Sequence, residues 1–256
     1  MRCSVLFSWL IAALRVAANT ITVWATPHDS YSSSVGVLGC KINTNRVAYW
    51  PMSVDCTNIC VSLSYGGRSV YLLRIDQSGG AYDISYDAWN YLMTGYSATS
   101  KPIAGGATAM EYENVDVSKC ADLIQTDGHK LPLSAANSMD FLASCLSQSD
   151  RGVAKKYVLY NILDSICSWG YDEVCTLDLS TSNQAKCPHP LGSPVALTSA
   201  PVYNIKYPNG KLVLASTGQV VAKPNLGRKV AHFEERELAL LVIAISLFIY
   251  SLLNGL

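Results

Sequence analysis

The chain has 256 residues, 50% of them hydrophobic, and its 19 basic side chains balance its 19 acidic ones. Without a net charge or a basic stripe, it lacks the electrostatic features of nucleic-acid-binding proteins, and no nucleic-acid partner is expected. Both ends are hydrophobic, and the residues between them suffice for one large domain or two small ones.

The N-terminal end is typical of a secretory signal peptide. Arg2 precedes an apolar run over residues 3–14, and Ala17-Ala18 provides a small-residue cleavage site. We therefore expect residues 1–18 to be removed and the mature protein to be exported. An uncleaved membrane anchor is the alternative, although the run is short for a bilayer span. Residues 19–32 are then expected to form an extended lead-in.

Residues 33–124 are predicted to be rich in β-strands. Glycine or proline separates most of the predicted strands, which is the pattern of a compact barrel. One helix is expected over residues 85–94, because apolar residues recur there at helical spacing. Ser85 is its predicted N-cap, and Gly95 lies where a left-handed residue would end it. The predicted strands cover residues 35–38, 46–50, 60–65, 69–75 and 107–117.

Residues 125–223 have a different pattern. Helical periodicity is present over residues 133–145 and 153–169, and a β-hairpin is expected over residues 203–215 around an Asn209-Gly210 turn. The segment is thus predicted to be an α/β extension. Two arrangements are compatible with this pattern: a second domain, or an elaboration packed on the β-rich region.

The C-terminal end, residues 224–256, is predicted to attach the protein to a membrane. Residues 238–253 are uncharged, and a charged spacer precedes them. This is the form of a GPI-attachment signal, for which Asn225 is the best ω-site. A single C-terminal membrane span is the competing interpretation, and an incorrect gene model is a third. Either of the first two places the protein at the outer face of the plasma membrane or in the cell wall.

The cysteines predict disulfides. Nine are present, and Cys3 lies in the predicted signal peptide, which leaves an even set in an exported chain. Cys56 and Cys60 have a spacing seen in zinc sites, but no second pair or His completes such a site, so no metal or other cofactor is expected. Because loop closure favours bridges inside a locally folded unit, the four cysteines before residue 125 are expected to pair among themselves, and the later four likewise. The eight are Cys40, Cys56, Cys60, Cys120, Cys145, Cys167, Cys175 and Cys187.

Two motifs point to a known barrel. Asp83-Ile84-Ser85 follows a β-prone run and a glycine loop, and precedes a helix that carries Ala88-Trp89. Residues 105–120 form a second β-prone segment, which ends in a cysteine. Over about residues 33–124, these motifs resemble the double-psi β-barrel superfamily of expansins, barwin-like proteins, rare-lipoprotein-A-type lytic transglycosylases and related endoglucanases.

The resemblance implies a mainly β fold: a six-stranded double-psi β-barrel, followed here by a disulfide-stapled α/β C-terminal extension. It also implies a fungal-type secreted wall protein held at the cell surface. The implied partner is a cell-wall polysaccharide such as chitin, glucan or cellulose.

The resemblance places Asp83 in a polysaccharide groove, where an Asp can protonate a glycosidic oxygen. Cleavage usually needs a second carboxylate, and the early strand at residues 40–50 has none. Asp55 lies beyond that strand, and Asp76 belongs to the same strand-loop unit as Asp83. The pattern therefore favours binding or loosening of polysaccharide without hydrolysis.

Two other functions stay open. One is a glycoside-cleaving enzyme of the endoglucanase or lytic-transglycosylase type that uses Asp83. The other is a surface interaction protein or effector with no sugar ligand. In the blandest interpretation, Asp83 caps the helix at Ser85 or bonds to loop amides.

Aromatic residues near Asp83 are the second signal, because flat rings stack on sugars. Trp50, Tyr82 and Tyr86 are expected to contribute polysaccharide-binding side chains together with Asp76, whereas Trp89 is expected to be a core residue of the helix. We predict that Asp83 lines an open groove beside at least one exposed ring from Trp50, Tyr82 or Tyr86.

Overall fold

The computed structural model describes residues 20–148 and 151–221. The predicted signal peptide at residues 1–18, the predicted ω-site Asn225 and the uncharged segment 238–253 lie outside the described residues. Within the two described ranges, no helix is long and apolar enough to cross a membrane.

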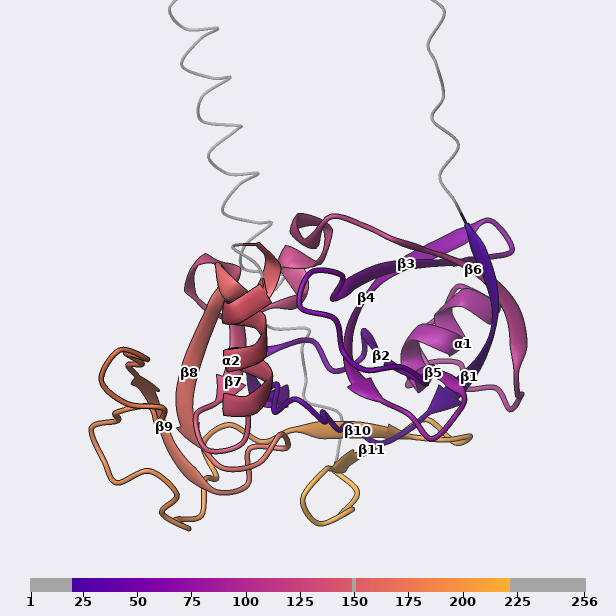
Figure 1. The fold of residues 1–256 in the computed structure, drawn as a ribbon. Helices are drawn as coiled ribbons and strands as arrows, with labels where there is room; N and C mark the ends of the chain where they lie inside the picture. The colour runs from indigo at the N-terminus through magenta and orange to yellow at the C-terminus, as the bar shows by residue number, and fades with distance from the viewer. Residues whose placement is uncertain (1–19, 149–150, 222–256) are drawn as a thin grey trace, which may run out of the picture. The chain divides into compact units, whose positions relative to one another are not determined.

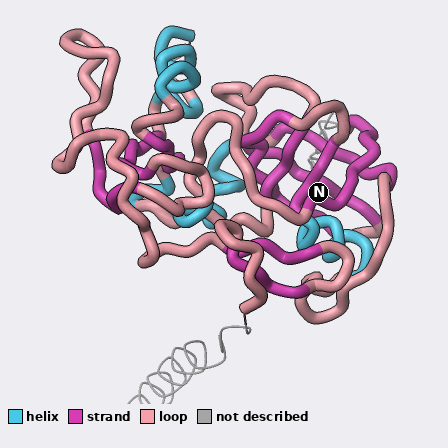
Figure 2. Tube along the Cα trace, turned by 90° about the horizontal axis from the view of Figure 1, so that it is seen from below, coloured by secondary structure: helices cyan, strands magenta, loops and turns pink. Residues whose placement is uncertain are grey.

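Six strands close into a barrel, whose crossing strands Figure 2 shows from below. β1 runs parallel to β5 and β2 runs parallel to β4, whereas the other neighbouring pairs are antiparallel. The predicted mainly β fold is confirmed. The order around the barrel is β1 (Ile21–His28), β5 (Tyr82–Ser85), β2 (Val47–Trp50), β4 (Arg68–Gln77), β3 (Cys60–Tyr65) and β6 (Thr108–Asn114), as labelled in Figure 1.

β1 consists of residues that the sequence analysis assigns to an extended lead-in, and that expectation is wrong. Val23 and Ala25 are buried in the barrel, whereas Thr22 and Trp24, which alternate with them, are exposed. This alternation has the period of two that a strand with one buried face requires. β1 pairs with β5 on one side and β6 on the other, so it closes the barrel.

The helix α1 (Tyr86–Thr94) begins and ends close to where the sequence predicts. Gly95 has φ 80°, and its N–H donates to the Tyr91 carbonyl, which is the expected left-handed end. Ser85 is the N-cap residue, but its side chain makes no capping hydrogen bond. Its hydroxyl instead accepts from the Val47 N–H at 2.9 Å and donates to the Thr44 carbonyl at 2.8 Å, so it ties β5 to β2.

The barrel interior is apolar, and α1 covers part of it. Trp89 is 1% exposed and packs so closely against Gly105 that a Cβ there would lie 2.2 Å from the indole ring. The expectation that Trp89 is a core residue is therefore confirmed. Arg68 Nε donates to the Leu92 carbonyl at 2.7 Å and so satisfies one of the free carbonyls at the end of α1. The other buried members of this core include Ala25, Ala48, Trp50, Val61, Leu63, Leu72, Ile84 and Met110.

The extension after residue 124 combines a three-stranded sheet, a helix and a hairpin. The helix predicted over residues 133–145 is in part correct, because α2 (Met139–Gln148) overlaps it. The helix predicted over residues 153–169 is wrong, since this segment contains the strand β8. Its aromatic and β-branched residues favour a strand, and β8 pairs in parallel with β7. The hairpin with its Asn209-Gly210 turn is confirmed. The strands are β7 (Leu131–Ser134), β8 (Tyr157–Ile162), β9 (Gly170–Cys175), β10 (Tyr203–Lys206) and β11 (Lys211–Leu214).

Short 3-10 helices fill the connections. The predicted strand over residues 35–38 is instead a loop, with a single bridge from Val37 to Leu133. The 3-10 helices are η1 (Gly39–Lys41), η2 (Val117–Leu123), η3 (Asp127–His129) and η4 (Gly152–Ala154).

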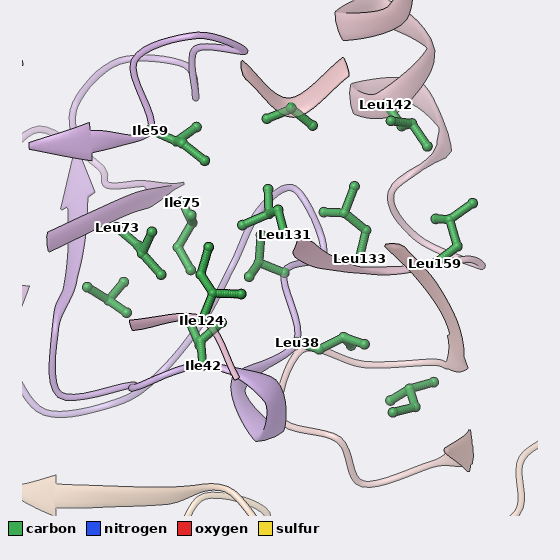
Figure 3. Packing of buried hydrophobic residues seen from close by; sticks show 14 of the residues in the cluster. Leu38, Ile42, Ile59, Leu73, Ile75, Ile124, Leu131, Leu133, Leu142 and Leu159 are labelled. Carbon is green, nitrogen blue, oxygen red and sulfur yellow. The ribbon is translucent and has the colours of Figure 1, made fainter. Parts of the chain in front are cut away.

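The barrel and the extension share one apolar core. Leu73 and Ile75 of β4 lie on the outside of the barrel and belong to the same buried cluster as Leu133 of β7 and Leu142 of α2. Figure 3 shows these side chains together with the linking residues Leu38, Ile42, Ile59 and Ile124. Of the two arrangements compatible with the sequence, packing of the extension on the barrel is therefore the one observed.

All eight described cysteines form disulfides, but the predicted division by region is wrong. Cys40 bonds to Cys167 and Cys56 bonds to Cys145, so two bridges join the barrel region to the extension. The pairs Cys60–Cys120 and Cys175–Cys187 stay within one region each. The expectation fails because loop closure favours local bridges only when the two regions fold as separate units, whereas their shared core brings the two regions together.

Removing the Cys40–Cys167 bridge is expected to cost more stability than removing the Cys175–Cys187 bridge. The Cys40–Cys167 bridge spans 127 residues and the Cys175–Cys187 bridge spans 12. Chain entropy then predicts a loss of about 5 kcal/mol for the double variant Cys40→Ser/Cys167→Ser and about 3 kcal/mol for Cys175→Ser/Cys187→Ser. Urea unfolding of both variants measures the difference, and equal losses would contradict the dependence on loop length.

Candidate functional site

A row of four outward-facing residues crosses four strands of the barrel. Thr26 of β1 pairs with Asp83 of β5, Asp83 pairs with Tyr49 of β2, and Tyr49 pairs with Asp76 of β4. Residues paired across neighbouring strands direct their side chains to the same face. Ile84, which follows Asp83 in β5, is fully buried in the barrel interior, so the row lies on the outside.

Asp83 is held by strands and not by the loop before a helix. It lies inside β5, between β1 and β2, and it is half-buried. The Thr26 hydroxyl donates a hydrogen bond to Asp83 Oδ1. A neighbouring strand therefore fixes the carboxylate. The N-cap residue of α1 is Ser85, not Asp83.

The far half of the row is covered. Asp76 is 7% exposed and accepts hydrogen bonds from the Ser32 hydroxyl, from the Ser34 N–H at 2.7 Å and from the Gln77 N–H at 2.8 Å. A buried carboxylate whose oxygens already accept three hydrogen bonds holds the chain around it. These internal donors, and not a sugar, are the observed partners of Asp76, for which polysaccharide binding was predicted.

Tyr49 lies between the open and the covered halves of the row. Burial raises the pKa of its phenol well above the ordinary value, and the nearby carboxylates of Asp76 and Asp83 raise it further. The phenol therefore stays protonated and neutral between the two acids. The His28 ring packs on it, with 4.6 Å between the ring centres.

Two of the three aromatic residues predicted to line the groove are buried. Trp50 is 0% exposed and Tyr86 is 1% exposed, so the prediction of an exposed ring at either position is wrong. Trp50 directly follows Tyr49 in β2, and successive residues of a strand face opposite sides. The Tyr86 hydroxyl donates to the Ile103 carbonyl at 2.8 Å. Tyr82 is half-buried and packs edge-on against Trp50 at 5.4 Å.

The exposed ring beside Asp83 belongs to Trp24, which the sequence analysis did not single out. Trp24 is 65% exposed and lies two residues before Thr26 in β1, so both side chains are on the outer face. Its partner on β6 is Ala109, a small residue that leaves the indole uncovered. The signal was present in the alternation of residues 20–26, which has the period of a strand.

The other carboxylate considered from the sequence, Asp55, holds its own turn. It accepts hydrogen bonds from the N–H groups of Thr57 and Asn58, at 2.6 and 2.9 Å. Partial burial alone would raise its pKa, but these hydrogen bonds lower the pKa to about 2. Neither Asp55 nor Asp76 is thus free to act with Asp83 as the second acid of a hydrolase. Over the described ranges, no cluster of three or more His, Cys, Asp or Glu could hold a metal ion.

Asp55→Asn is expected to destabilise the fold by about 1 kcal/mol at pH 7, a value reduced for solvent screening of this partly exposed group. Because the folded-state pKa is lowered to about 2 from 3.8, the stabilisation is present above about pH 4 and is lost as the pH falls through 2. Chemical denaturation of both proteins between pH 7 and pH 2 measures this. A difference that stays constant over that window would contradict the assignment.

Comparison with known families agrees with this barrel. Residues 20–123 match the model of the cerato-platanin family, a span of about two fifths of the chain that runs from the start of β1 to the end of η2. Members of this family have an expansin-like double-psi β-barrel, which agrees with the closed barrel observed and confirms the resemblance drawn from the motifs. The family consists of secreted, fungal, cell-wall-associated proteins linked to wall carbohydrates. No curated protein matches the chain.

Proposed function

We propose that this protein is a secreted, expansin-like wall protein that binds or loosens cell-wall polysaccharide without hydrolysing it. The observation that carries the proposal is the exposed indole of Trp24 on the same outer face as the half-buried Thr26–Asp83 pair. Chitin, glucan and cellulose are the candidate polymers, because all three present flat sugar faces and ring hydroxyls.

Trp24 supplies the stacking surface. Its indole has the small side chain of Ala109 beside it on β6, and the exposed Ala81 lies just before β5 on the other side. The ring is therefore open to solvent. Stacking of an aromatic face on an apolar sugar face excludes water from both, which is the main favourable term in such contacts.

Thr26 and Asp83 supply the polar contacts. The Asp83 carboxylate has acceptor capacity beyond the bond from Thr26, since a carboxylate offers about four acceptor positions. Sugar hydroxyls that donate to it would form charge-assisted hydrogen bonds, which are stronger than neutral ones. Trp24 and Asp83 together therefore suit a ligand that is apolar on one face and hydroxylated at its edge.

The arrangement favours binding over cleavage. Asp76, the acid in the same row, is buried under three donors and does not reach a water molecule in an open groove. Asp55 and Asp76 therefore do not supply the second carboxylate that retaining and inverting hydrolysis usually use. A lytic transglycosylase, whose substrate supplies its own nucleophile, is the enzyme that one acid would allow.

Trp24→Ala is expected to weaken retention on insoluble polysaccharide roughly ten-fold, or about 1.4 kcal/mol, while stability changes by less than about 0.5 kcal/mol. Asp83→Asn keeps the shape of the side chain and removes its charge, and a several-fold weakening is expected. Pull-down isotherms on chitin, β-glucan and cellulose measure both. The matched control is Trp169→Ala, since Trp169 is 47% exposed in the extension. Equal losses in Trp24→Ala and Trp169→Ala would contradict this site.

The same preparations test for cleavage. No new reducing ends or anhydro sugars are expected from soluble glucan or peptidoglycan fragments. Release of such products that disappears in Asp83→Asn would replace the binding proposal with the enzyme.

We also propose that the C-terminal segment attaches the protein to the cell surface through a GPI anchor at Asn225. The proposal is based on the uncharged segment 238–253 and the spacer before it. Phosphatidylinositol-specific phospholipase C is expected to release the protein from intact cells, and Asn225→Gln to prevent its attachment. Resistance to the phospholipase together with a need for detergent would indicate a membrane span instead.

A further inference from the structure

One buried cation in the barrel wall forms no ion pair within the described residues. Arg74 lies in β4 opposite Ala48, whose side chain faces the barrel interior. Arg74 is 6% exposed, and its buried Nε has no hydrogen-bond partner. Among the ion pairs of the described residues, none includes Arg74.

The protein offers little to balance this charge. Asp55 is the acid whose charge acts on Arg74, but both of its oxygens are engaged by Thr57 and Asn58 in its own turn. The guanidinium carbon lies 5.6 Å from the centre of the Trp50 ring, and a cation–π contact satisfies none of the five N–H donors. Buried charges in proteins are nearly always paired, so an anion from outside is the partner that is missing.

Three aromatic side chains lie near Arg74, one in direct contact and two through that ring. The Trp50 ring packs against Tyr82 at 5.4 Å and against Tyr112 at 4.6 Å, and its own Nε1 also lacks an acceptor. Tyr82 and Tyr112 are half-buried, so the edge of the cluster meets solvent at these two residues. Arg74, Trp50, Tyr82 and Tyr112 are named here the barrel-end cluster.

We propose that the barrel-end cluster binds a carboxylate, specifically that of a uronic-acid residue in a polysaccharide. A guanidinium fork matches a carboxylate in geometry and forms two parallel hydrogen bonds with it. The tyrosine rings beside the fork provide the contact that a sugar ring needs and a free inorganic anion does not. The inference rests on the proposed function, to which it adds an acidic class of ligand at a second place on the barrel.

The test is titration of the full-length secreted protein with trigalacturonate, followed by calorimetry. Wild type is expected to bind it, with affinity that falls at least ten-fold between 50 and 500 mM NaCl. Arg74→Met is expected to lose binding at least thirty-fold, and Arg74→Lys, which keeps the charge without the fork, at least ten-fold. Lys101→Met is the matched control, since Lys101 lies over the Tyr96 ring at the surface, and its affinity should match wild type.

A thermal melt separates ligand binding from a structural role. Replacing a buried, unpaired charge with an apolar side chain of similar length is expected to leave the ligand-free melting temperature unchanged or higher. A lower melting temperature in Arg74→Met would assign Arg74 to stability alone and overturn the proposal. Should Arg74→Met fail to fold, Arg74→Lys decides it, and wild-type affinity in that variant overturns the proposal.

Three further results decide the ligand. Failure of wild type to bind trigalacturonate overturns the inference, and so does equal binding of acetate or inorganic phosphate at the same concentration. Retention on neutral polymer that depends on Trp24, without any trigalacturonate binding, would remove this inference and leave the proposed function intact. Loss of acid binding in Arg74→Met with unchanged retention on neutral polymer supports two separate sites.

Discussion

Closure of the barrel by β1 is the constraint on which the rest of the structure depends. β1 hydrogen-bonds to β5 on one side and to β6 on the other, and it brings Trp24 and Thr26 to the outer face beside Asp83. Without this strand β5 and β6 would be open edges, and unpaired strand edges are exposed to association with other chains. The same pairing also positions the Asp83 carboxylate, since its hydrogen-bond donor Thr26 belongs to β1. The pairing of β1 therefore both closes the barrel and assembles the candidate site.

The extension divides the outer face of the barrel into two environments. Where it packs, Leu73 and Ile75 become part of a common core, and Tyr49 and Asp76 are buried with them. Where it does not pack, Trp24, Thr26 and Asp83 remain accessible. Two residues of one polar row, Asp76 and Asp83, thus differ in environment: the first anchors the chain at residues 32–34, and the second is half-buried beside Thr26.

Local patterns in the sequence were sufficient for the elements that local interactions determine. The helix α1 with Gly95 at its end and the hairpin around Asn209-Gly210 follow from spacing and turn chemistry, and both were predicted. The segment at β8 is predicted to be helical, because its apolar and aromatic residues fit the helical period as well as the strand period. The pairing with β7 decides between the two. The cross-region disulfides depend on packing between distant segments, and no spacing of cysteines contains that information.

The sequence identifies Asp83 as a candidate site residue, but it does not predict which side chains lie around it. Asp83 was found through a motif, but the direction of each neighbouring ring depends on strand parity, which a shift of one residue reverses. The motif therefore predicts an exposed ring at Trp50, which is buried, and it gives no signal for Trp24, since residues 19–32 are predicted to be an extended lead-in. The missing hydrogen-bond partner of Arg74 could not be predicted from the sequence either. It depends on which residues the neighbouring side chains already contact.

The loop between Cys175 and Cys187 also affects how the protein withstands damage. Residues 178–184 of this loop are exposed, and the disulfide joins the chain on either side of them. A protease that cuts the backbone there separates no part of the molecule, because the bridge still links the two fragments. In an environment rich in secreted proteases, such a loop can be cleaved while the barrel, the shared core and the outer face with Trp24 remain one covalent object.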